Sequence, residues 1–567
     1  MSHRLREPVL PMPASPGPAS ALVRMPLPYP WQSEIRGTAR IHLAGTVVAR
    51  DAILAAAAAG DLEALGGLLR READAFGFIF ENDSHVVAAT DRIRGYPVYV
   101  READGLFEVA ASTCCWTAPE NAGEFDETRV GRFLASGYTI GSDTLFSTVR
   151  RLVTGEAVLL GKAGGPARFH RNYLFKPEFE ENGESDDVWE GRLEAALDAA
   201  TDRAMARAGG AAIWVPLSAG YDSRTVLAKL VERGYDRIET FSYGVPGNAE
   251  AAVAREIAAK AGVPWRHVPS LPERPREIFA QDHVSGYFLE AGGLGTTPAM
   301  TEYFPLRFMV EAGLLREGDC IVNGQSGDYL TGAHLPKADT VAEAVRFIRN
   351  KHFGLLRGEL AAFGEDAASA LLDEWSRSYL HAPLDRLRTP EDVLSFYLAF
   401  EGQERQCEYV VQQQRLYDFL RLKWSLPLWD GDLMDVFEAA PLHEHRSQRL
   451  YLRYLRRWNF RGLFDEGRRP HNPWPRWKFA IQSVARIASL FGGEAGKQRA
   501  YKHLYYWSER NYLYALFGRR THRGMIDEIR GPVSLFTLDY VRRVRRHLGL
   551  EPRRPGELLF NRLQAGA

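Results

Sequence analysis

The hydrophobic positions of the chain follow two different rhythms. Before residue 177 they mostly alternate with polar positions in short runs, which is typical of strands with one buried face. These runs lie at residues 40–48, 76–80, 85–90, 96–100 and 106–110. Residues 52–71 instead repeat with the helical period and are rich in alanine and leucine. The first rhythm predicts an α+β domain with many paired strands.

The second rhythm alternates strands with helices and follows a polar, acidic stretch at residues 177–187, which is the predicted linker. Residues 211–217 form a continuous apolar run, as expected of a strand buried on both faces. Further strands are predicted at 238–243 and 266–268, and helices at 188–207, 225–233 and 249–261. This pattern predicts a doubly wound parallel sheet, an α/β domain. From about residue 340 the sequence is mostly helical.

Composition and charge narrow the class of protein. The 567 residues are too many for one core, so two or three domains are expected. The 71 basic and 72 acidic residues balance, which gives no reason to expect a nucleic acid or an anionic membrane as partner. None of the four cysteines has the spacing of a zinc site or a disulfide framework, which fits a cytoplasmic protein. Residues 1–35 are rich in proline and are predicted to be an irregular arm rather than a signal peptide.

The turn after the first strand of the predicted parallel sheet carries the residue types of a phosphate-binding loop. Small residues at Ser218 and Gly220 let the backbone approach a ligand, and the helix that follows presents free N–H groups. The hydroxyls of Ser218 and Ser223 can donate to phosphate oxygens. Asp222 would repel phosphates unless a cation lay between them, so it implies Mg²⁺. The alternative is an ordinary strand–turn–helix joint, in which serine, glycine and aspartate are common.

A second glycine-rich turn strengthens this interpretation. The strand-like residues 320–322 precede the sequence NGQSGD, which ends at Asp328. Ligands of open α/β sheets bind beyond the carboxyl ends of the strands. Asp222 and Asp328 are therefore predicted to share one Mg²⁺ over the same triphosphate. The alternative is that the second turn is merely exposed.

With both turns in this order, the chain resembles the asparagine synthetase family. Members carry SGGxDS after the first strand of the synthetase domain and a GEGSDE-like turn later, where this chain has SAGYDS and GQSGDY. Supporting segments are TFSYG at 240–244, PLWD at 427–430 and TDRIRGYP at 90–97, and Arg453 resembles the arginine of the family's K-x-x-L-R. The resemblance covers most of residues 40–460.

The resemblance implies a domain plan. Residues 36–176 would form a degenerate glutaminase-like domain, a sandwich of the Ntn-hydrolase type. Residues 188–567 would form an adenine-nucleotide α-hydrolase-like (PP-loop) synthetase domain with a helical C-terminal part. The family hydrolyses glutamine with an N-terminal cysteine, whereas here Met1 is followed by Ser2 and the first cysteine is Cys114. Glutaminase activity is therefore not expected.

The resemblance also implies ATP and Mg²⁺ as cofactors and assigns roles to residues. ATP and its pyrophosphate would contact Leu217, Ser218, Ala219, Gly220, Tyr221, Asp222, Ser223, Ser242, Gly244, Gly324, Gln325, Ser326 and Gly327. Mg²⁺ would bind Asp222 and Asp328, and the substrate would contact Thr296 and Thr297.

Three further residues are candidates for catalysis. Arg449 stands where K-x-x-L-R has its catalytic lysine, and an arginine remains a cation but has a different geometry. Glu404 and Glu408 are candidate general bases for an amine, with a solvated helix face as the alternative.

The reaction that the resemblance implies is AMP-forming amide synthesis. A carboxylate of a small molecule or peptide, aspartate or another acid, would attack the α-phosphorus of ATP, and ammonia or an amine would then attack the acyl-adenylate. One alternative is an intramolecular cyclase that resembles β-lactam synthetases or lasso-peptide cyclases. Another is a nucleotide-binding scaffold without turnover, which Arg449 and the absent cysteine favour. The acid, the amine donor and the oligomeric state, a homodimer among the possibilities, stay open.

Overall fold

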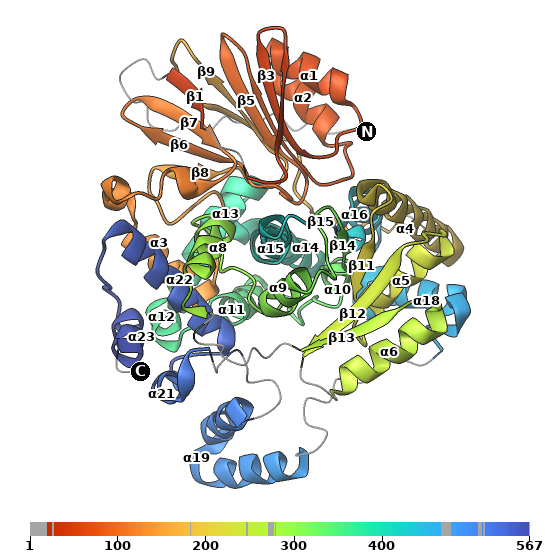
Figure 1. Cartoon of the computed structure of the whole chain (residues 1–567), viewed down its shortest axis with the longest axis vertical. Coiled ribbons are helices and arrows are strands. Elements are labelled where there is room, and N and C mark those ends of the chain that lie inside the picture. The colour runs from red at the N-terminus through yellow and green to blue at the C-terminus, as the bar shows by residue number, and fades with distance from the viewer. Residues whose placement is uncertain are drawn as a thin grey trace.

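The computed structural model of the chain describes residues 20–24, 28–181, 183–244, 248–269, 277, 279–465, 478–507, 513 and 516–565. A domain of antiparallel strands forms one end of the molecule, and a larger body of helices surrounds a parallel sheet (Figure 1). The fold is therefore mixed, with α+β and α/β parts, as the two rhythms of the sequence predict.

Two sheets pack face to face in the N-terminal domain. The six-stranded sheet has the order β10 (Arg168–Arg171), β9 (Glu156–Gly161), β5 (His85–Thr90), β4 (Phe76–Glu81), β3 (Ala39–Gly45) and β2 (Gln32–Arg36). The four-stranded sheet has the order β1 (Ser20–Val23), β7 (Leu106–Ala110), β6 (Tyr99–Ala103) and β8 (Val149–Arg151). Buried side chains of both sheets, among them Ile79 and Val109, form the core between them. Helices α1 (Arg50–Ala59) and α2 (Leu62–Leu69) cover the outer face of the larger sheet.

The prediction of an irregular arm at residues 1–35 is wrong for its second half. Residues 20–23 form β1 and residues 32–36 form β2. β1 pairs in parallel with β7, and Ala21 and Val23 are buried. The sequence around β1 is rich in proline and shows no local strand pattern. The strand depends on its hydrogen-bond partner β7, which lies more than 80 residues further along the chain.

The segment predicted to be a linker at 177–187 is shorter than expected, and part of it is packed against the larger domain. Helix α4 (Asp186–Ala208) begins inside it, and the carboxylates of Asp186 and Asp187 stand in its first turn, where the helix dipole favours negative charge. Phe179 is buried, and its ring lies 5.2 Å from that of His445. The connection between the domains is therefore packed onto the larger body.

The parallel sheet confirms the strand–helix rhythm. Its order is β13 (Trp265–Pro269), β12 (Ile238–Gly244), β11 (Ile213–Pro216), β14 (Cys320–Val322) and β15 (Lys423–Ser425). Helix α5 (Tyr221–Glu232) follows β11, and α6 (Ala249–Ala261) packs against β12 and β13. The chain runs outward from β11 in one direction to β13, and later places β14 on the other side of β11. The crevice between the carboxyl ends of β11 and β14 is a topological switch point, where sheets of this kind bind ligands.

Helices make up most of the remaining chain, as predicted from residue 340 on. They are α3 (Glu127–Ser136), α8 (Asp282–Gly292), α9 (Tyr303–Glu311), α10 (Gly327–Leu330), α11 (Val341–His352), α12 (Arg357–Ala362), α13 (Glu365–Leu380), α14 (Pro390–Phe400), the π-helix η4 (Glu401–Val410), α15 (Arg415–Phe419), α16 (Gly431–Ala439), α17 (Leu442–His445), α18 (Arg449–Trp458), α19 (Lys478–Trp507), α21 (Gly518–Met525), α22 (Pro532–Leu548) and α23 (Pro555–Ala565). One hydrophobic core runs from α3 of the N-terminal domain through the parallel sheet to α22. The two domains are thus joined by shared packing.

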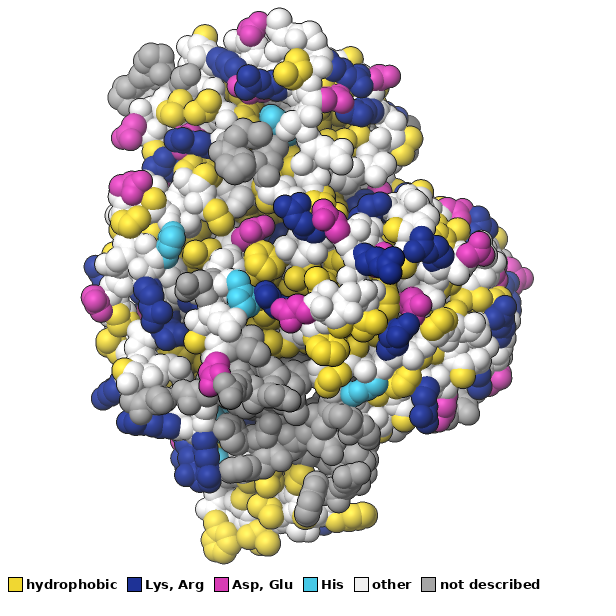
Figure 2. Space-filling model, in the orientation of Figure 1, with side chains coloured by type: hydrophobic (Ala, Val, Ile, Leu, Met, Phe, Trp, Pro, Cys, Tyr) yellow, Lys and Arg dark blue, Asp and Glu magenta, His cyan; other side chains and the backbone are white. Residues whose placement is uncertain are grey.

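Helix α19 lies at the lower end of Figure 1, and Nζ of its Lys502 donates to the carbonyls of Ile526 and Ile529. Its exposed apolar side chains include Phe479, Leu490 and Phe491, and apolar side chains gather at this end in Figure 2. Among the described helices, none has both the length and the apolar content needed to cross a bilayer.

Candidate functional site

A cleft of about 500 Å³ lies at the carboxyl ends of β11, β12 and β14. Its lining includes Ser218, Asp222 and Ser223 from the turn after β11, and Gln325 and Asp328 from the turn after β14. The two turns that the sequence analysis singles out therefore face the same cleft. The parallel pairing of β11 with β14 brings them together, since both strands end at one edge of the sheet.

The turn after β11 is closed by its own hydroxyls. The backbone N–H of Ser218 donates to Oγ of Ser223 at 3.1 Å, and the N–H of Gly220 donates to Oγ of Ser218 at 3.1 Å. The N-cap residue of helix α5, Gly220, makes no side-chain cap hydrogen bond. The helix begins beside the cleft, so its positive dipole end faces the place where an anion could bind.

The turn after β14 presses two glycines against Asp222. A Cβ atom at Gly324 would lie 2.6 Å from the carbonyl carbon of Asp222, and one at Gly327 would lie 3.0 Å from the carboxylate carbon of Asp222. A side chain at either glycine would push the turns apart. The Asp222 carboxylate therefore lies against the residue that precedes Asp328, and both aspartates line the cleft.

This pair suits Mg²⁺ better than a metal held by protein ligands alone. In the described part of the chain, no three His, Cys, Asp or Glu side chains cluster as a metal site. Mg²⁺ is usually held by one or two carboxylates together with substrate phosphates and water. Asp222 and Asp328 supply two carboxylates, and the cleft leaves the other ligand positions to a nucleotide.

Tyr451 of α18 supports the first turn from behind. Its hydroxyl lies 2.8 Å from Oγ1 of Thr225. Burial and the neighbouring Asp222 carboxylate raise the pKa of Tyr451 well above its usual range. The hydroxyl therefore keeps its proton and can donate a hydrogen bond to the carboxylate of Asp222.

His334 supports the second turn. Its Nε2 lies 3.2 Å from Oδ2 of Asp328, and its Nδ1 lies 2.7 Å from Oε1 of the buried Glu401. Burial alone would lower the pKa of His334, but the hydrogen bonds to Asp328 and Glu401 raise it to about 9. A protonated imidazole at neutral pH therefore holds the carboxylate of Asp328.

The third wall comes from β12 and contains Phe241, Ser242 and Tyr243. The hydroxyl of Ser242 donates to the carbonyl of Leu217 at 2.7 Å and accepts a hydrogen bond from Nε1 of Trp265 at 3.0 Å. Ser242 thus lines the cleft, and its hydroxyl already has two partners.

The sequence analysis missed several lining residues. Glu302 is one, and its carboxylate accepts hydrogen bonds from the hydroxyls of Tyr417 at 2.7 Å and Tyr243 at 3.1 Å. His334 is another, and the π-helix η4 adds Arg405, Gln406 and Val410. The polar run EGQERQ inside an otherwise apolar helical stretch was the available signal.

The candidate general bases lie elsewhere. Glu404 is buried and accepts hydrogen bonds from Nε1 of Trp375 at 2.6 Å and from the N–H of Gly141 at 2.8 Å. Glu408 is buried between Arg94 and Arg151. Neither lines the cleft, and neither lies on a solvated helix face, because η4 is packed against the N-terminal domain.

Arg449 and the two threonines are also outside the cleft. Arg449 is half exposed and forms ion pairs with Asp186 at 3.4 Å and Glu444 at 3.9 Å. Thr297 donates to the carbonyl of Gly137 at 2.9 Å, and Thr296 is buried beside it. Among the predicted nucleotide contacts, Ala219, Gly220, Tyr221, Gly244 and Gly327 are not lining residues, although all of these except Gly220 are next in the chain to one that is.

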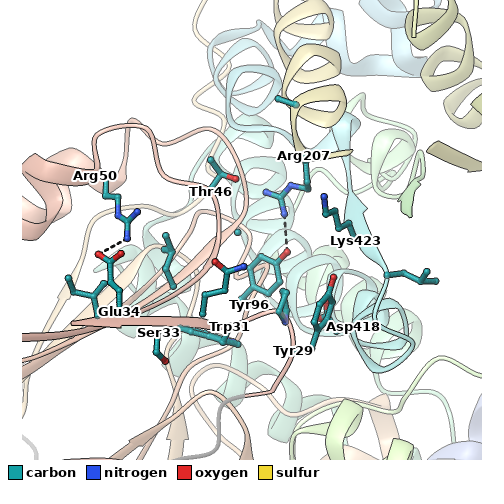
Figure 3. A pocket seen from close by; sticks show the side chains of 17 residues that line it. Tyr29, Trp31, Ser33, Glu34, Thr46, Arg50, Tyr96, Arg207, Asp418 and Lys423 are labelled. Carbon is teal, nitrogen blue, oxygen red and sulfur yellow. Dashed lines mark hydrogen bonds and ion pairs between the residues drawn. The ribbon is translucent and has the colours of Figure 1, made fainter. Parts of the chain in front are cut away.

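A second hollow of about 460 Å³ lies between the N-terminal domain and the end of α4 (Figure 3). Arg207 donates to the hydroxyl of Tyr96 at 2.9 Å there, and Arg50 pairs with Glu34 at 2.7 Å. Its lining includes no residue of either acidic turn. The candidate site is therefore the cleft at the parallel sheet.

Comparisons with known proteins agree with this location. Residues 192–464 match the model of a family described as asparagine synthase, and this range contains both acidic turns. No curated protein matches the chain. One solved structure is glutamine phosphoribosylpyrophosphate amidotransferase from B. subtilis complexed with ADP and GMP, with 12% identity and a TM-score of 0.14. The match covers 52% of this chain and 58% of that one, and a similarity this low carries no argument. The cleft therefore lies in a domain, residues 192–464, that belongs to the asparagine synthase family.

Proposed function

We propose that the chain is a ligase that activates a carboxylic acid with ATP, as an acyl-adenylate, and transfers the acyl group to ammonia or an amine. An asparagine synthase domain supports an ATP-dependent amide-ligase activity in general. The observation that carries the finer proposal is the contact between Asp222 and the turn of Gly324 and Gly327, in a cleft that both Asp222 and Asp328 line.

Each wall of the cleft has a part in this proposal. The hydroxyls of Ser218 and Ser223 and the first N–H groups of α5 would bind the pyrophosphate oxygens of ATP. Asp222 and Asp328 would hold Mg²⁺. When bound, the ion would neutralise charge on the departing pyrophosphate. The edge of β12 would lie along the adenine.

The reaction balances as two displacements. The acid's carboxylate oxygen attacks the α-phosphorus, and the bond to the pyrophosphate breaks. The amine nitrogen then attacks the acyl carbon, loses a proton and releases AMP. Donors fixed in the cleft beforehand favour the first step, because they need no rearrangement as charge develops on the leaving group.

We also propose that the N-terminal domain is Ntn-hydrolase-like and that the larger domain has the PP-loop fold. Two face-to-face sheets support the first assignment, and the glycine turn after the first parallel strand supports the second. Since β1 and β2 belong to the sheets, the N-terminal domain begins before residue 36.

The test is ATP–pyrophosphate exchange with a panel of carboxylic acids. Exchange with at least one acid is expected from the wild type, and Asp222→Asn and Asp328→Asn should each abolish it. Asp202→Asn is the matched control, because Asp202 is half exposed on α4, away from the cleft, and pairs with Arg233. Exchange that survives both cleft substitutions would refute the proposed site.

A nucleotide-binding scaffold without turnover is the second candidate. Arg449 lies outside the cleft, and the described lining contains no lysine to replace it. ATP binding without exchange for any acid would favour the scaffold. A product in which one molecule supplies both carboxylate and amine would instead favour a cyclase.

A further inference from the structure

We infer that the first half of helix α19 docks on the surface of a membrane that contains anionic phospholipids. The surface concerned, which we call the α19 face, consists of the exposed apolar side chains Phe479, Val484, Ile487, Leu490 and Phe491. Apolar side chains gather at the lower end of the molecule in Figure 2, the end at which α19 lies in Figure 1. None of the five residues lines the cleft, so this inference goes beyond the proposed function and does not depend on it.

The five side chains share one side of a helical segment. Gly493 has φ 58° and ψ −153°, so the helical path breaks there and residues 478–492 form a segment of their own. Val484, Ile487 and Phe491 follow one another at intervals of three and four residues, which places them on one side of a helix. Ile481 and Ala485, four residues apart, are buried and mark the side that packs onto the protein. The α19 face is therefore turned away from the protein.

Exposure of large apolar side chains is concentrated on this segment. The described part of the chain has twelve such exposed side chains, and five of them form the α19 face. The other seven are Leu22, Ile35, Val48, Val188, Phe308, Phe347 and Leu558, each on a different segment. Phe479 is 83%, Leu490 81% and Phe491 88% exposed. Scattered apolar residues are ordinary on a surface, whereas a continuous patch marks a site of interaction with a protein or a membrane.

Positive charge accompanies the α19 face. From residue 467 to residue 493 the sequence has no Asp or Glu and five basic residues, which are Arg468, Arg469, Arg476, Lys478 and Arg486. The side chain of Arg486 is exposed, and among the described residues no carboxylate forms an ion pair with it. Arg486 precedes Leu490 by one helical turn, so its aliphatic stem can lie beside the apolar face while the guanidinium reaches outward. The balanced charge of the whole chain therefore does not describe this segment.

The surface of an anionic bilayer suits both properties. A helix with phenylalanine and leucine on one side and basic residues beside them lies in the plane of the membrane interface. The apolar side chains then enter the boundary of the acyl chains, and the cations remain among the headgroup phosphates. The α19 face would supply the first contact, and Arg486 with its basic neighbours in the sequence the second.

A second copy of the chain is the main alternative occupant of the α19 face. In a twofold dimer the same patch meets itself, so Arg486 and its basic neighbours would approach their own copies. The next acidic residue along the chain, Glu494, already pairs with Lys497 at 2.9 Å. Repulsion between like charges therefore opposes a dimer through this face, whereas anionic headgroups neutralise the same charges.

The experiment measures how the full chain co-sediments with two kinds of vesicle, phosphatidylcholine alone and phosphatidylcholine mixed with anionic phosphatidylglycerol. We expect binding to the mixed vesicles that weakens as salt is added, and much weaker binding to the neutral ones. Phe479→Ala and Phe491→Ala should each raise the Kd for mixed vesicles about tenfold, because each removes a large apolar contact. Arg486→Gln should raise it about fivefold and make it less sensitive to salt. Since all three side chains are exposed, Tm should not fall.

Phe308→Ala and Arg421→Gln are the matched controls, because both side chains are exposed on other segments of the chain. Both variants should bind mixed vesicles as the wild type does. Absence of wild-type binding to mixed vesicles would overturn the inference, and so would equal binding to both kinds of vesicle. Sedimentation equilibrium without lipid gives a further check. A wild-type dimer that Phe491→Ala dissociates would assign the α19 face to a second copy instead.

Discussion

At the scale of single residues, burial changes the proton affinity of one carboxylate in particular, that of Asp418. Asp418 lies buried next to Arg415, with an ion-pair distance of 2.7 Å, and accepts a hydrogen bond from Nε1 of Trp424 at 3.0 Å. Burial is the largest influence and raises the pKa of Asp418 from 3.8 to about 7. Asp418 is therefore a group whose protonation is linked to folding.

The sign of this linkage gives a prediction. Because the pKa of Asp418 is higher in the folded chain, its stabilising contribution is complete below pH 3.8 and is lost as the pH rises to about 7. We expect Asp418→Asn, which cannot ionise, to gain thermal stability relative to the wild type over this range. The measurement is the difference in Tm between the two proteins at each pH, by calorimetry.

Asp202→Asn is the control, because it makes the same substitution at a half-exposed carboxylate instead of a buried one. A constant difference for Asp418→Asn would mean that the pair with Arg415 keeps Asp418 charged throughout.

Single residues of the site were predictable only where a local motif carries them. Asp222 and Asp328 each end a glycine-rich turn after an apolar run, so the sequence marks both. Arg405 and Glu302 reach the same cleft from segments without such a motif. The sequence also suggests Glu404 and Glu408 as candidate bases, and neither lines the cleft. Helical periodicity cannot tell which side of η4 faces the cleft and which faces the other domain.

At the scale of elements, the site depends on how closely the turn after β14 approaches α5. Gly324 has no room for a side chain, since a Cβ atom would lie 2.8 Å from the backbone nitrogen of Ser223. We expect Gly324→Ala to separate the two turns by a few tenths of an ångström or more. Displacements of about 1 Å can cost about 100-fold in rate. Pyrophosphate exchange should therefore fall by at least about tenfold, while Tm changes by only a few degrees.

The matched control is Gly286→Ala in the interior of α8, where a Cβ atom would meet nothing within 4 Å. Alanine favours a helix over glycine by about 1 kcal/mol, so this variant should keep its exchange activity and lose no stability. Full activity of Gly324→Ala would mean that the turns need not touch for exchange.

Helices and strands were predictable from the sequence where burial of the element requires a simple pattern of hydrophobic residues. Strand β11 is buried on both faces and lies in a continuous apolar run, so its position was predicted closely. β1 has four residues and draws its hydrogen bonds from β7. Short strands of this kind depend on a distant partner, and no local pattern reports one.

At the scale of the whole molecule, a buried ion-pair cluster joins the two domains. Glu408 of η4 lies between Arg94 and Arg151 of the N-terminal domain, with 2.5 Å between Oε1 of Glu408 and Nη1 of Arg151. All three side chains are nearly inaccessible to solvent. The same helix presents Arg405 to the cleft, so this cluster ties the N-terminal domain to one wall of the site.

Removal of one partner tests whether the cluster is structural. Glu408→Ala would leave two buried arginines without their carboxylate, which usually costs about 3–5 kcal/mol. We expect a lower free energy of unfolding by about this amount, measured from the midpoint of denaturation by urea.

Glu317→Ala is the control, because its exposed carboxylate is 3.8 Å from Arg421 and should contribute under about 1 kcal/mol. At temperatures where Glu408→Ala is folded, exchange should persist, since Glu408 does not line the cleft. A stable Glu408→Ala variant without exchange would contradict a purely structural role and would indicate that Glu408 takes part in the reaction.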